Sequence, residues 1–369
     1  FAFILVLTIS SCKKEDPIEC ISPIAETCDG ENYCFTRNGN LTVDYSGQTA
    51  RLNQLTEIVS YLKTANTPGT ALDLTQLLDM WSNAGGNGSA YFSAEAAIPG
   101  KNLSDKCFLP YVSAYEAYFF EITEISQSVQ AAEEGIAGHM VSSTDPSKVY
   151  LLNANGMELT QIIEKGMMGD VFLYQANSTY LQGTLDGSFD NTNIVNADGG
   201  KHYTEAEHKF DEAFGYLGLP TDFPQITEGL RFHGKYGNTI DAAVGTNAIM
   251  DAFVEARTAI TNGDDPSEAI DQVQYHWSRI CAGTAIHYLK QANDNIEDQA
   301  LKSHVLSEAL AFIGNLVHAS PFGLSADEVY EAQELLGFNF YQVDSAQIDA
   351  TILYLVDHTS IELPEIASL

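Results

Sequence analysis

The chain has 369 residues, of which 17 are basic and 50 acidic, so that its formal net charge is -33 at pH 7. This excess of carboxylates disfavours nucleic acids and anionic membrane surfaces as partners, because both are bound by clustered Lys and Arg. A hydrophobic content of 45%, with 18 Tyr and 18 Phe, excludes a disordered chain. The length allows one large or two moderate domains with a full core. Cations and basic partners are compatible with this charge, and so is acidity that only keeps the protein soluble.

The chain begins with a short apolar run, FAFILVLTISSC, in which small residues precede Cys12. This order is typical of a bacterial lipoprotein signal, in which the cysteine is lipidated and becomes the first mature residue. Because the run has no initiator Met and no basic segment before it, we expect the sequence to start inside the signal. We therefore predict a signal peptide over 1–12 that ends at lipidated Cys12. The alternative is an ordinary cysteine at the end of an exposed hydrophobic tail.

Residues 13–31 contain two prolines and several acids without periodicity, which predicts a flexible tether. At its start, the segment Lys13-Lys14-Glu15-Asp16 resembles the lysine-plus-two-acids signal that exports lipoproteins of the Bacteroidota to the cell surface. The resemblance implies a lipid-anchored protein of the outer membrane, exposed at the cell surface, with a periplasmic location as the alternative.

Five cysteines remain besides Cys12, so at least one is a free thiol or is paired outside the chain. Three of them lie close together in sequence, and in an oxidising compartment we expect one local disulfide among these three. The sequence leaves the pairing open, and it contains no CxxC spacing to support a zinc ribbon. The five cysteines are Cys20, Cys28, Cys34, Cys107 and Cys281.

Alternating residues around Asn38-Gly39 predict a small hairpin with strands at about 33–36 and 41–45, and these are the only strands that we predict. Beyond Gly47 the apolar residues recur with helical period. We therefore predict that residues 32–369 form a single domain, an all-α multi-helix bundle. A bundle divided into two lobes is the alternative. The helical segments are 49–65, 72–83, 111–129, 155–183, 203–217, 239–262, 270–288, 299–318, 325–337 and 346–357.

Two long segments rich in Gly, Asn, Asp or Pro, 184–202 and 218–238, are predicted as loops. Gly166 and Gly169 interrupt the helical pattern of 155–183, where each glycine costs about 1 kcal/mol relative to Ala. A helix tolerates this cost where another backbone approaches closely. We expect a tight helix crossing there, with a ligand against the bare backbone as the alternative.

The first candidate site lies on helix 203–217. His208 is three and four residues from Asp211 and Glu212, so these side chains share one face of the helix, and Glu207 lies beside them. One imidazole and several carboxylates are able to hold a divalent or ferric ion. However, the apolar stripe of the helix faces away from His208 and Glu212, which favours a solvated surface unless another helix layer covers it.

The second candidate site is the pair His304 and Glu308 on helix 299–318. Glu308 falls within an apolar stripe of a helix that is apolar on two faces, and an unpaired carboxylate in such an interior costs several kcal/mol. We expect it to be paired with His304, with an arginine such as Arg279, or with a metal. The pair serves either as a buried structural ion pair or as a functional site.

Three stretches, FTRNGNLTVDYSGQTARL, QIIEKGMMGDVFLYQA and YTEAEHKFDEAFGYLG, resemble the Bacteroidota lipoprotein family called domain of unknown function 4856, over about 31–369. This family name implies no activity. More remotely, the chain is similar to imelysin-like proteins, which are acidic helical bundles linked to iron uptake. Their motif G-x-H-x-x-E falls on Ala206, His208 and Asp211, and His208 alone matches. The resemblance implies metal association rather than a positioned catalytic base, because Asp is still an oxygen ligand.

These features lead to the hypothesis of a surface lipoprotein, held in outer-membrane lipid through Cys12, that binds iron, another metal or a metal chelate. Its partner would be an outer-membrane uptake system, such as a TonB-dependent receptor or an imelysin-like protein. One alternative is an imelysin-like metallopeptidase with His208 and Glu212 as metal ligand and base, and another is a metal-free interaction module. Iron or zinc are the cofactors compatible with the candidate site. The sequence lacks the P-loop and dinucleotide fingerprints, so we expect no nucleotide cofactor.

Overall fold

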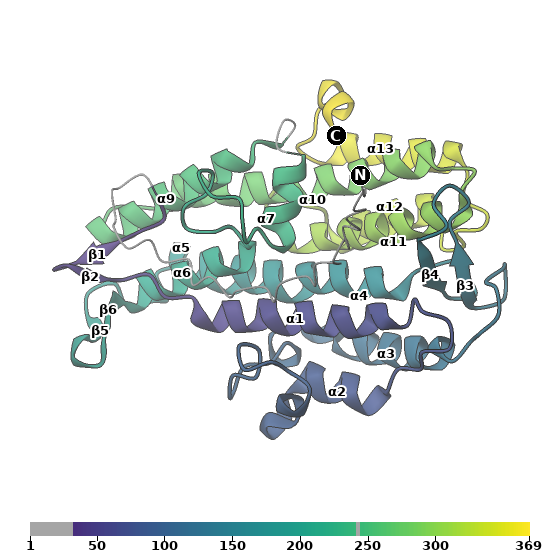
Figure 1. The fold of residues 1–369 in the computed structure, drawn as a ribbon. Helices are drawn as coiled ribbons and strands as arrows, with labels where there is room; N and C mark the ends of the chain where they lie inside the picture. The colour runs from purple at the N-terminus through teal and green to yellow at the C-terminus, as the bar shows by residue number, and fades with distance from the viewer. Residues whose placement is uncertain (1–31, 241–243) are drawn as a thin grey trace, which may run out of the picture.

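The computed structural model describes residues 32–240 and 244–369, which form an all-α bundle with short β-hairpins at its two ends (Figure 1). The predicted fold class, a multi-helix bundle with a small N-terminal hairpin, is confirmed. The predicted signal peptide with Cys12 and the predicted tether lie outside the described residues. Within the described residues, no helix has both the length and the apolar character needed to cross a membrane.

Each of the predicted helical segments contains a helix, and most helix ends lie within a few residues of the expected ones. The helix predicted over 239–262 starts later, the one predicted over 270–288 extends to Asp294, and the one predicted over 155–183 is α-helical only over parts of this range. One further helix, α7, begins inside the predicted loop 218–238. The α-helices are α1 (Ser46–Thr64), α2 (Leu74–Ser82), α3 (Val112–Ser126), α4 (Leu159–Met167), α5 (Gln182–Leu185), α6 (Glu205–Leu217), α7 (Phe232–Thr239), α9 (Thr246–Asn262), α10 (Ser267–Asp294), α11 (Gln299–Asn315), α12 (Ala326–Leu336) and α13 (Ser345–His358).

Polar side chains fix the starts of several helices. Asp73 accepts hydrogen bonds from two backbone N–H groups at the start of α2. Ser325 and Glu328 form a capping box at the start of α12, and Asp344 and Gln347 form another at the start of α13. Each cap satisfies backbone N–H groups that have no partner inside the helix. These helix boundaries are therefore encoded locally in the sequence.

The helices α4 and α11 pack on each other at the centre of the bundle. On one side α11 contacts α10, which also packs on α9 and α13, and on the other side α4 contacts α1 and α3 (Figure 1). Just after α4, a Cβ atom on Gly169 would lie 2.6 Å from Cγ of Asn315 on α11, and a Cβ atom on Gly166 of α4 would lie 2.6 Å from Oη of Tyr115 on α3. The expected tight crossing is thus confirmed at Gly169, because no larger residue fits there.

The helical chain continues from α4 to α5 through two π-helical segments, Met168–Leu173 and Gln175–Leu181. The sequence predicts a helix over this region, but the apolar period does not distinguish a π-helical turn from an α-helical one. Short π-helical segments occur frequently at functional sites, because the wider turn redirects a side chain. Asp170 lies in the first of these segments.

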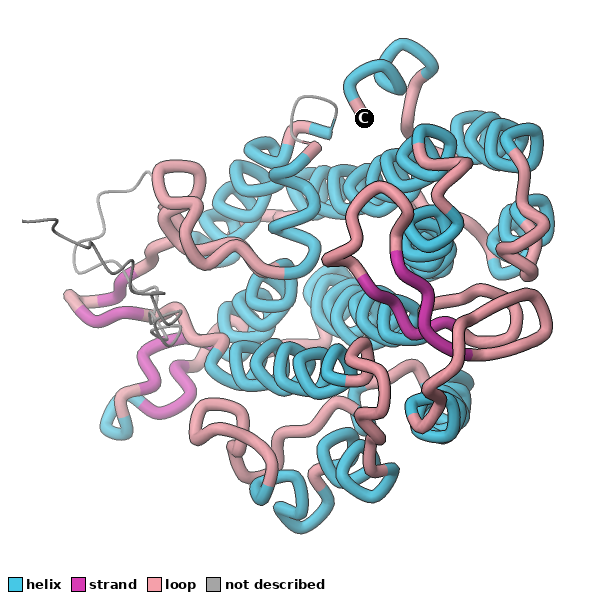
Figure 2. Tube along the Cα trace, turned by 45° about the vertical axis from the view of Figure 1, so that its right-hand side comes forward, coloured by secondary structure: helices cyan, strands magenta, loops and turns pink. Residues whose placement is uncertain are grey.

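The hairpin at Asn38-Gly39 is confirmed, although its strands are shorter than predicted. The prediction of a single hairpin is wrong, because the described residues contain two further antiparallel hairpins, one of them partly inside the expected loop 184–202 (Figure 2). Strands of three or four residues are too short to show a clear alternation. The strands are β1 (Thr36–Arg37), β2 (Asn40–Leu41), β3 (Gly138–Val141), β4 (Val149–Leu152), β5 (Ile194–Asn196) and β6 (Lys201–Thr204).

Cys34 is disulfide-bonded, whereas Cys107 and Cys281 are buried free thiols. The prediction of at least one free thiol is therefore confirmed. Cys20 and Cys28, the other two cysteines of the predicted local disulfide, lie outside the described residues.

Candidate functional site

Glu207, from the first candidate site, is oriented by a capping box at the start of α6. Oγ1 of Thr204 accepts a hydrogen bond from the Glu207 backbone N–H over 3.2 Å, and Oε2 of Glu207 accepts one from the Thr204 backbone N–H over 2.8 Å. The carboxylate is thereby turned toward the helix N-terminus, where it is fully buried. The spacing Thr-x-x-Glu is the sequence signal for this arrangement.

Arg257 of α9 binds two buried carboxylates of α6, those of Glu207 and Asp211. Its Nη1 lies 2.9 Å from Oε1 of Glu207, and its Nε lies 2.8 Å from Oδ1 of Asp211. Arg37, next to the hairpin turn, adds a second guanidinium 2.7 Å from Glu207, and the hydroxyl of Tyr33 donates to Asp211 over 2.9 Å. The first candidate site is thus largely a buried ion-pair network that joins the N-terminal hairpin to α6 and α9.

The two carboxyl groups of this network differ in pKa. Burial alone raises the pKa of a carboxyl group, and a neighbouring cation lowers it. At Glu207 the hydrogen bond from Arg37 and the charge of Arg257 outweigh burial and lower the pKa to about 2. At Asp211 burial prevails over Arg257 and raises the pKa to about 6. Glu207 is bound by two guanidinium groups and Asp211 by one, which accounts for the difference.

His208 and Glu212 do not join this network. Nδ1 of His208 lies 2.9 Å from the backbone carbonyl of Asp44, and Glu212 accepts hydrogen bonds from Lys209 over 2.7 Å and from Gln48 over 3.0 Å. Gln48 comes from α1, which covers this side of α6, so the expected solvated face is wrong for Glu212, which is buried.

Metal binding by the predicted set His208, Glu207, Asp211 and Glu212 stays a prediction. The carboxylates of Glu207 and Asp211 face arginine rather than His208, and the His208 ring lies 4.0 Å from Glu212. In the part of the chain that the structure describes, no group of three or more His, Cys, Asp or Glu residues has a geometry that holds a metal ion.

The second candidate site opens into a pocket of about 420 Å³, which we call the His304 pocket. His304 and Glu308 of α11 form part of its wall, with further residues from α7, α10 and the segment around β4. A cavity of this volume is within the range of small-molecule sites. Its polar lining consists of Lys148, Tyr150, Lys235, Tyr236, Thr239, Thr284, His287, Tyr288, Gln291, His304 and Glu308.

Glu158, at the start of α4, orients His304. Nδ1 of His304 lies 2.5 Å from Oε2 of Glu158, and its Nε2 lies 3.6 Å from Oε2 of Glu308. The ring also stacks on Tyr150, with centroids 4.5 Å apart. Burial disfavours the charged imidazole, but the Glu158 carboxylate outweighs burial and raises the pKa of His304. The pocket therefore presents an imidazolium at moderately acidic pH.

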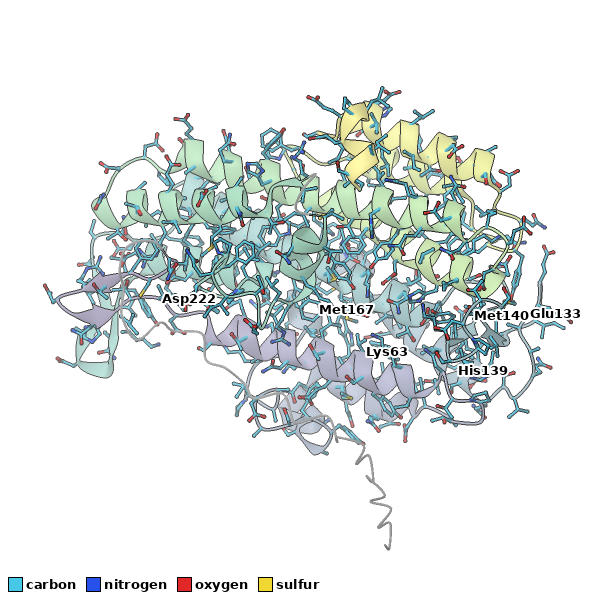
Figure 3. All side chains as sticks on the ribbon, turned by 45° about the horizontal axis from the view of Figure 1, so that its top comes forward. Lys63, Glu133, His139, Met140, Met167 and Asp222 are labelled. Atoms are coloured by element: carbon cyan, nitrogen blue, oxygen red, sulfur yellow. The ribbon has the colours of Figure 1, made fainter. Side chains whose placement is uncertain are left out.

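Opposite charges alternate behind the pocket wall. Lys165, which is buried, lies 3.2 Å from Glu308 and 2.8 Å from Glu164. Glu164 also contacts Lys63 of α1, labelled in Figure 3, over 3.5 Å. Burial disfavours the Lys165 ammonium, but the carboxylates around it raise its pKa well above the ordinary value. Glu308 is thus paired with a buried cation, as expected for a carboxylate in an apolar interior.

Three tyrosines supply neutral hydroxyl groups to the same pocket. Burial, followed by the charge of nearby carboxylates, raises the pKa of Tyr150 and of Tyr288. Burial likewise raises the pKa of Tyr236 to about 12. All three are therefore protonated at neutral pH and are able to donate a hydrogen bond. Together with the cations, they form a wall suited to a ligand that accepts hydrogen bonds.

The partners that decide both sites are not visible in the sequence pattern. Arg279, one of the expected partners of Glu308, pairs with Glu365 over 2.6 Å, and Lys165 is the cation at Glu308. Arg257 and Glu158 were not identified. The ion-pair partners lie 46 or more residues apart in sequence, beyond any local pattern. The local signals of a buried carboxylate are the position of Glu308 in an apolar stripe and the Thr-x-x-Glu spacing at the start of α6.

Comparison with known proteins gives one match. The model of a family described as a domain of unknown function, DUF4856, matches residues 30–336, which include both candidate sites. Neither a search of curated proteins nor a search of solved structures found a match. The match spans the hairpin and the helices through α12, in agreement with the resemblance of the three sequence stretches. This chain therefore belongs to the DUF4856 family.

Proposed function

We propose that this protein is a lipid-anchored capture protein that binds a small anionic ligand, such as an anionic metal chelate, in the His304 pocket. It would pass the ligand to an outer-membrane uptake system. The proposal is supported by the charge of the pocket, by its hydroxyl donors and by the predicted signal peptide ending at Cys12.

The charge of the pocket wall carries the proposal. Acidic residues outnumber basic ones 50 to 17 in the chain, yet the pocket is lined by Lys148, Lys235 and His304 and by one carboxylate, that of Glu308. That carboxylate is already paired with Lys165. The ammonium groups of Lys148 and Lys235, in a hollow of an otherwise acidic protein, create a local field that attracts anions.

The fixed donors of the pocket add selectivity. Glu158 holds His304 through Nδ1, and Nε2 of His304 lies 3.6 Å from Glu308, another residue of the pocket wall. The hydroxyl groups of Tyr236 and Tyr288 are neutral donors beside it. Carboxylate and phosphate oxygens accept hydrogen bonds from such donors and pair with ammonium groups at the rim.

The geometry favours a chelated metal over a bare ion. A bare cation at Glu308 would have to displace the buried ammonium of Lys165, and one at Asp211 would have to displace Arg257. Removing either partner would leave an uncompensated buried charge, which is costly. A chelate brings its own metal ligands and presents carboxylate oxygens to the protein. We therefore propose that iron would be bound as an anionic chelate and not as a bare ion.

Isothermal titration calorimetry with citrate, ferric citrate and inorganic phosphate at pH 7 tests the proposal. We expect at least one of them to bind with Kd below about 100 μM, and Lys235→Gln to weaken it by about fivefold. Lys201→Gln, which removes an exposed lysine outside the pocket, is the matched control and should change Kd by less than about twofold.

The same titrations are able to overturn the proposal. It fails if none of the three anions binds with Kd below about 1 mM, or if the two lysine variants weaken binding equally. Tighter binding of ferric citrate than of citrate supports the chelate. Equal affinity removes iron from the proposal and leaves an organic anion.

The membrane anchor has a separate test. Mass spectrometry of the protein from native membranes should find a lipid on Cys12, and Cys12→Ser should release the protein from the membrane fraction. Digestion of intact cells with proteinase K should degrade the wild-type protein if it is exposed at the surface. An unmodified Cys12 would contradict the anchor without affecting the ligand proposal.

A further inference from the structure

A second cavity, of about 410 Å³, lies between α3, α4, α11 and α12 and shares no lining residue with the His304 pocket. Four aromatic side chains line it, Tyr111, Tyr115, Tyr118 and Phe338, and we call it the tyrosine cavity. Tyr111 and Phe338 are 37% and 42% exposed, so the rings reach from the interior to the surface. The cavity is large enough for a ligand with an aromatic or aliphatic body.

Between these rings, the wall of the tyrosine cavity is mostly apolar, and at two glycines it is formed by the helix backbone. Leu159, Ile162 and Leu310 supply apolar surface, and Gly166 and Gly314 expose the helix backbone. A Cβ atom on Gly314 would meet only the amide nitrogen of Gln333, 3.6 Å away, so the space in front of it is open. The apolar body of a ligand would displace water from this surface favourably.

The charge of the tyrosine cavity is opposite to that of the His304 pocket. Glu121 and Asp170 are its charged lining residues, and among the described residues the lining contains no Lys, Arg or His. Glu121 accepts a hydrogen bond from the neutral amide of Asn153 over 3.0 Å. No lysine or arginine of the described chain forms an ion pair with Glu121, so its charge is available to a ligand, whereas Asp170 is paired with His318 over 2.8 Å.

Asp170 is fixed from two sides. It lies in the π-helical segment Met168–Leu173 and accepts hydrogen bonds from Oη of Tyr115 over 2.5 Å and from Nε2 of His318 over 2.8 Å. His318 is buried behind the wall and does not line the cavity. Two neighbouring side chains thus hold the carboxylate rigidly at the wall. Burial, and then the charges of Asp170 and Glu121, raise the pKa of Tyr118.

From this combination we infer that the tyrosine cavity binds an organic cation, an amine or quaternary ammonium group attached to an apolar body. The faces of aromatic rings attract cations through their quadrupole, and the negative charge of the carboxylates attracts a cation but not a neutral ligand. The apolar body would lie against Ile162 and Leu310. The cation would lie between Glu121, Asp170 and the tyrosine rings.

Three probes of similar size and different charge test this inference. Calorimetric titration at pH 7 compares 2-phenylethylamine, a cation, with the neutral 2-phenylethanol and the anionic 3-phenylpropanoate. We expect the amine to bind at least about tenfold more tightly than the alcohol, and the carboxylate to bind more weakly than both.

Variants on two helices locate the binding. Glu121→Gln retains an oxygen for the Asn153 hydrogen bond and should weaken amine binding about fivefold with little effect on the alcohol. Glu116→Gln, an exposed residue of α3 outside the lining, is the matched control. Ala311→Met fills the cavity and should abolish binding of all three probes, and its melting temperature shows whether it is folded.

The inference fails if the amine and the alcohol bind equally, if none of the probes binds with Kd below about 5 mM, or if Glu121→Gln and Glu116→Gln have the same effect. It also fails if a folded Ala311→Met variant binds the amine as the wild type does. These results do not depend on the titrations of the His304 pocket with anions, so either proposal is able to fail alone.

Discussion

Nη1 of Arg257 lies 2.9 Å from Oε1 of Glu207 at a place where both side chains are fully buried. The two residues are 50 positions apart, on α9 and α6. Paired, each charge compensates the other, whereas either one alone would be an uncompensated charge in an apolar interior. The pair therefore holds these helices in one arrangement, and its removal is the clearest test of its structural role.

Replacement of Arg257 should be strongly destabilising. In Arg257→Met the two carboxylates of Glu207 and Asp211 would keep only Arg37 as a cationic partner, and we expect the free energy of unfolding to fall by about 3–5 kcal/mol. Urea denaturation followed by circular dichroism measures it. Lys209→Met, which breaks a pair with a 30% exposed lysine, should cost only about 0–1 kcal/mol. Equal losses would contradict the structural role of Arg257.

The charge of Glu207 should make stability depend on pH in the acid range. Its pKa is about 2 in the folded protein against 4.5 for an ordinary glutamate, so its contribution is present above pH 4.5 and is lost as the pH falls toward 2. Urea unfolding of wild type and Glu207→Gln at pH 7, 5, 4 and 3 should give a difference that shrinks below pH 4.5. A constant difference would show that the charge of Glu207 does not stabilise the fold.

Gly169, in the π-helical segment after α4, and Gly314 of α11 should respond differently to replacement by alanine. In Gly169→Ala the new Cβ would overlap Asn315, and we expect a loss of about 1–3 kcal/mol in unfolding free energy. In Gly314→Ala the nearest atom is 3.6 Å away, so the higher helix propensity of Ala should give no loss and a gain of up to about 1 kcal/mol. Urea denaturation of both variants compares them, and a neutral Gly169→Ala would contradict the close packing.

The two buried thiols should be unreactive in the native protein. Burial raises the pKa of Cys107 and of Cys281, so neither forms the reactive thiolate near neutral pH. Alkylation with iodoacetamide at pH 8, followed by peptide mass spectrometry, should leave both cysteines unmodified in the native state. Both should be modified fully in urea, and rapid labelling of either one in the native state would show that it is accessible.

The sequence predicted the helices well because their signal is local. Apolar period, the Asn38-Gly39 turn and capping residues act within a few positions, and the fold class follows from them. The short strands β3 to β6 and the π-helical turns were missed, because three or four residues show no clear period and a π-helical turn leaves the apolar pattern unchanged.

By itself, the sequence determined the helical bundle and the unusual position of Glu308 in an apolar helix. It also predicts a signal peptide that ends at Cys12, and this stays a prediction. The tertiary structure alone decided the charge partners: Arg257 for Glu207 and Asp211, and Lys165 for Glu308. It also directed Glu207 and Asp211, two of the carboxylates predicted to share a metal with His208, toward Arg257. The physical reason is that helix period fixes which face a side chain occupies, whereas ion pairs and cavities depend on which distant helices pack against that face.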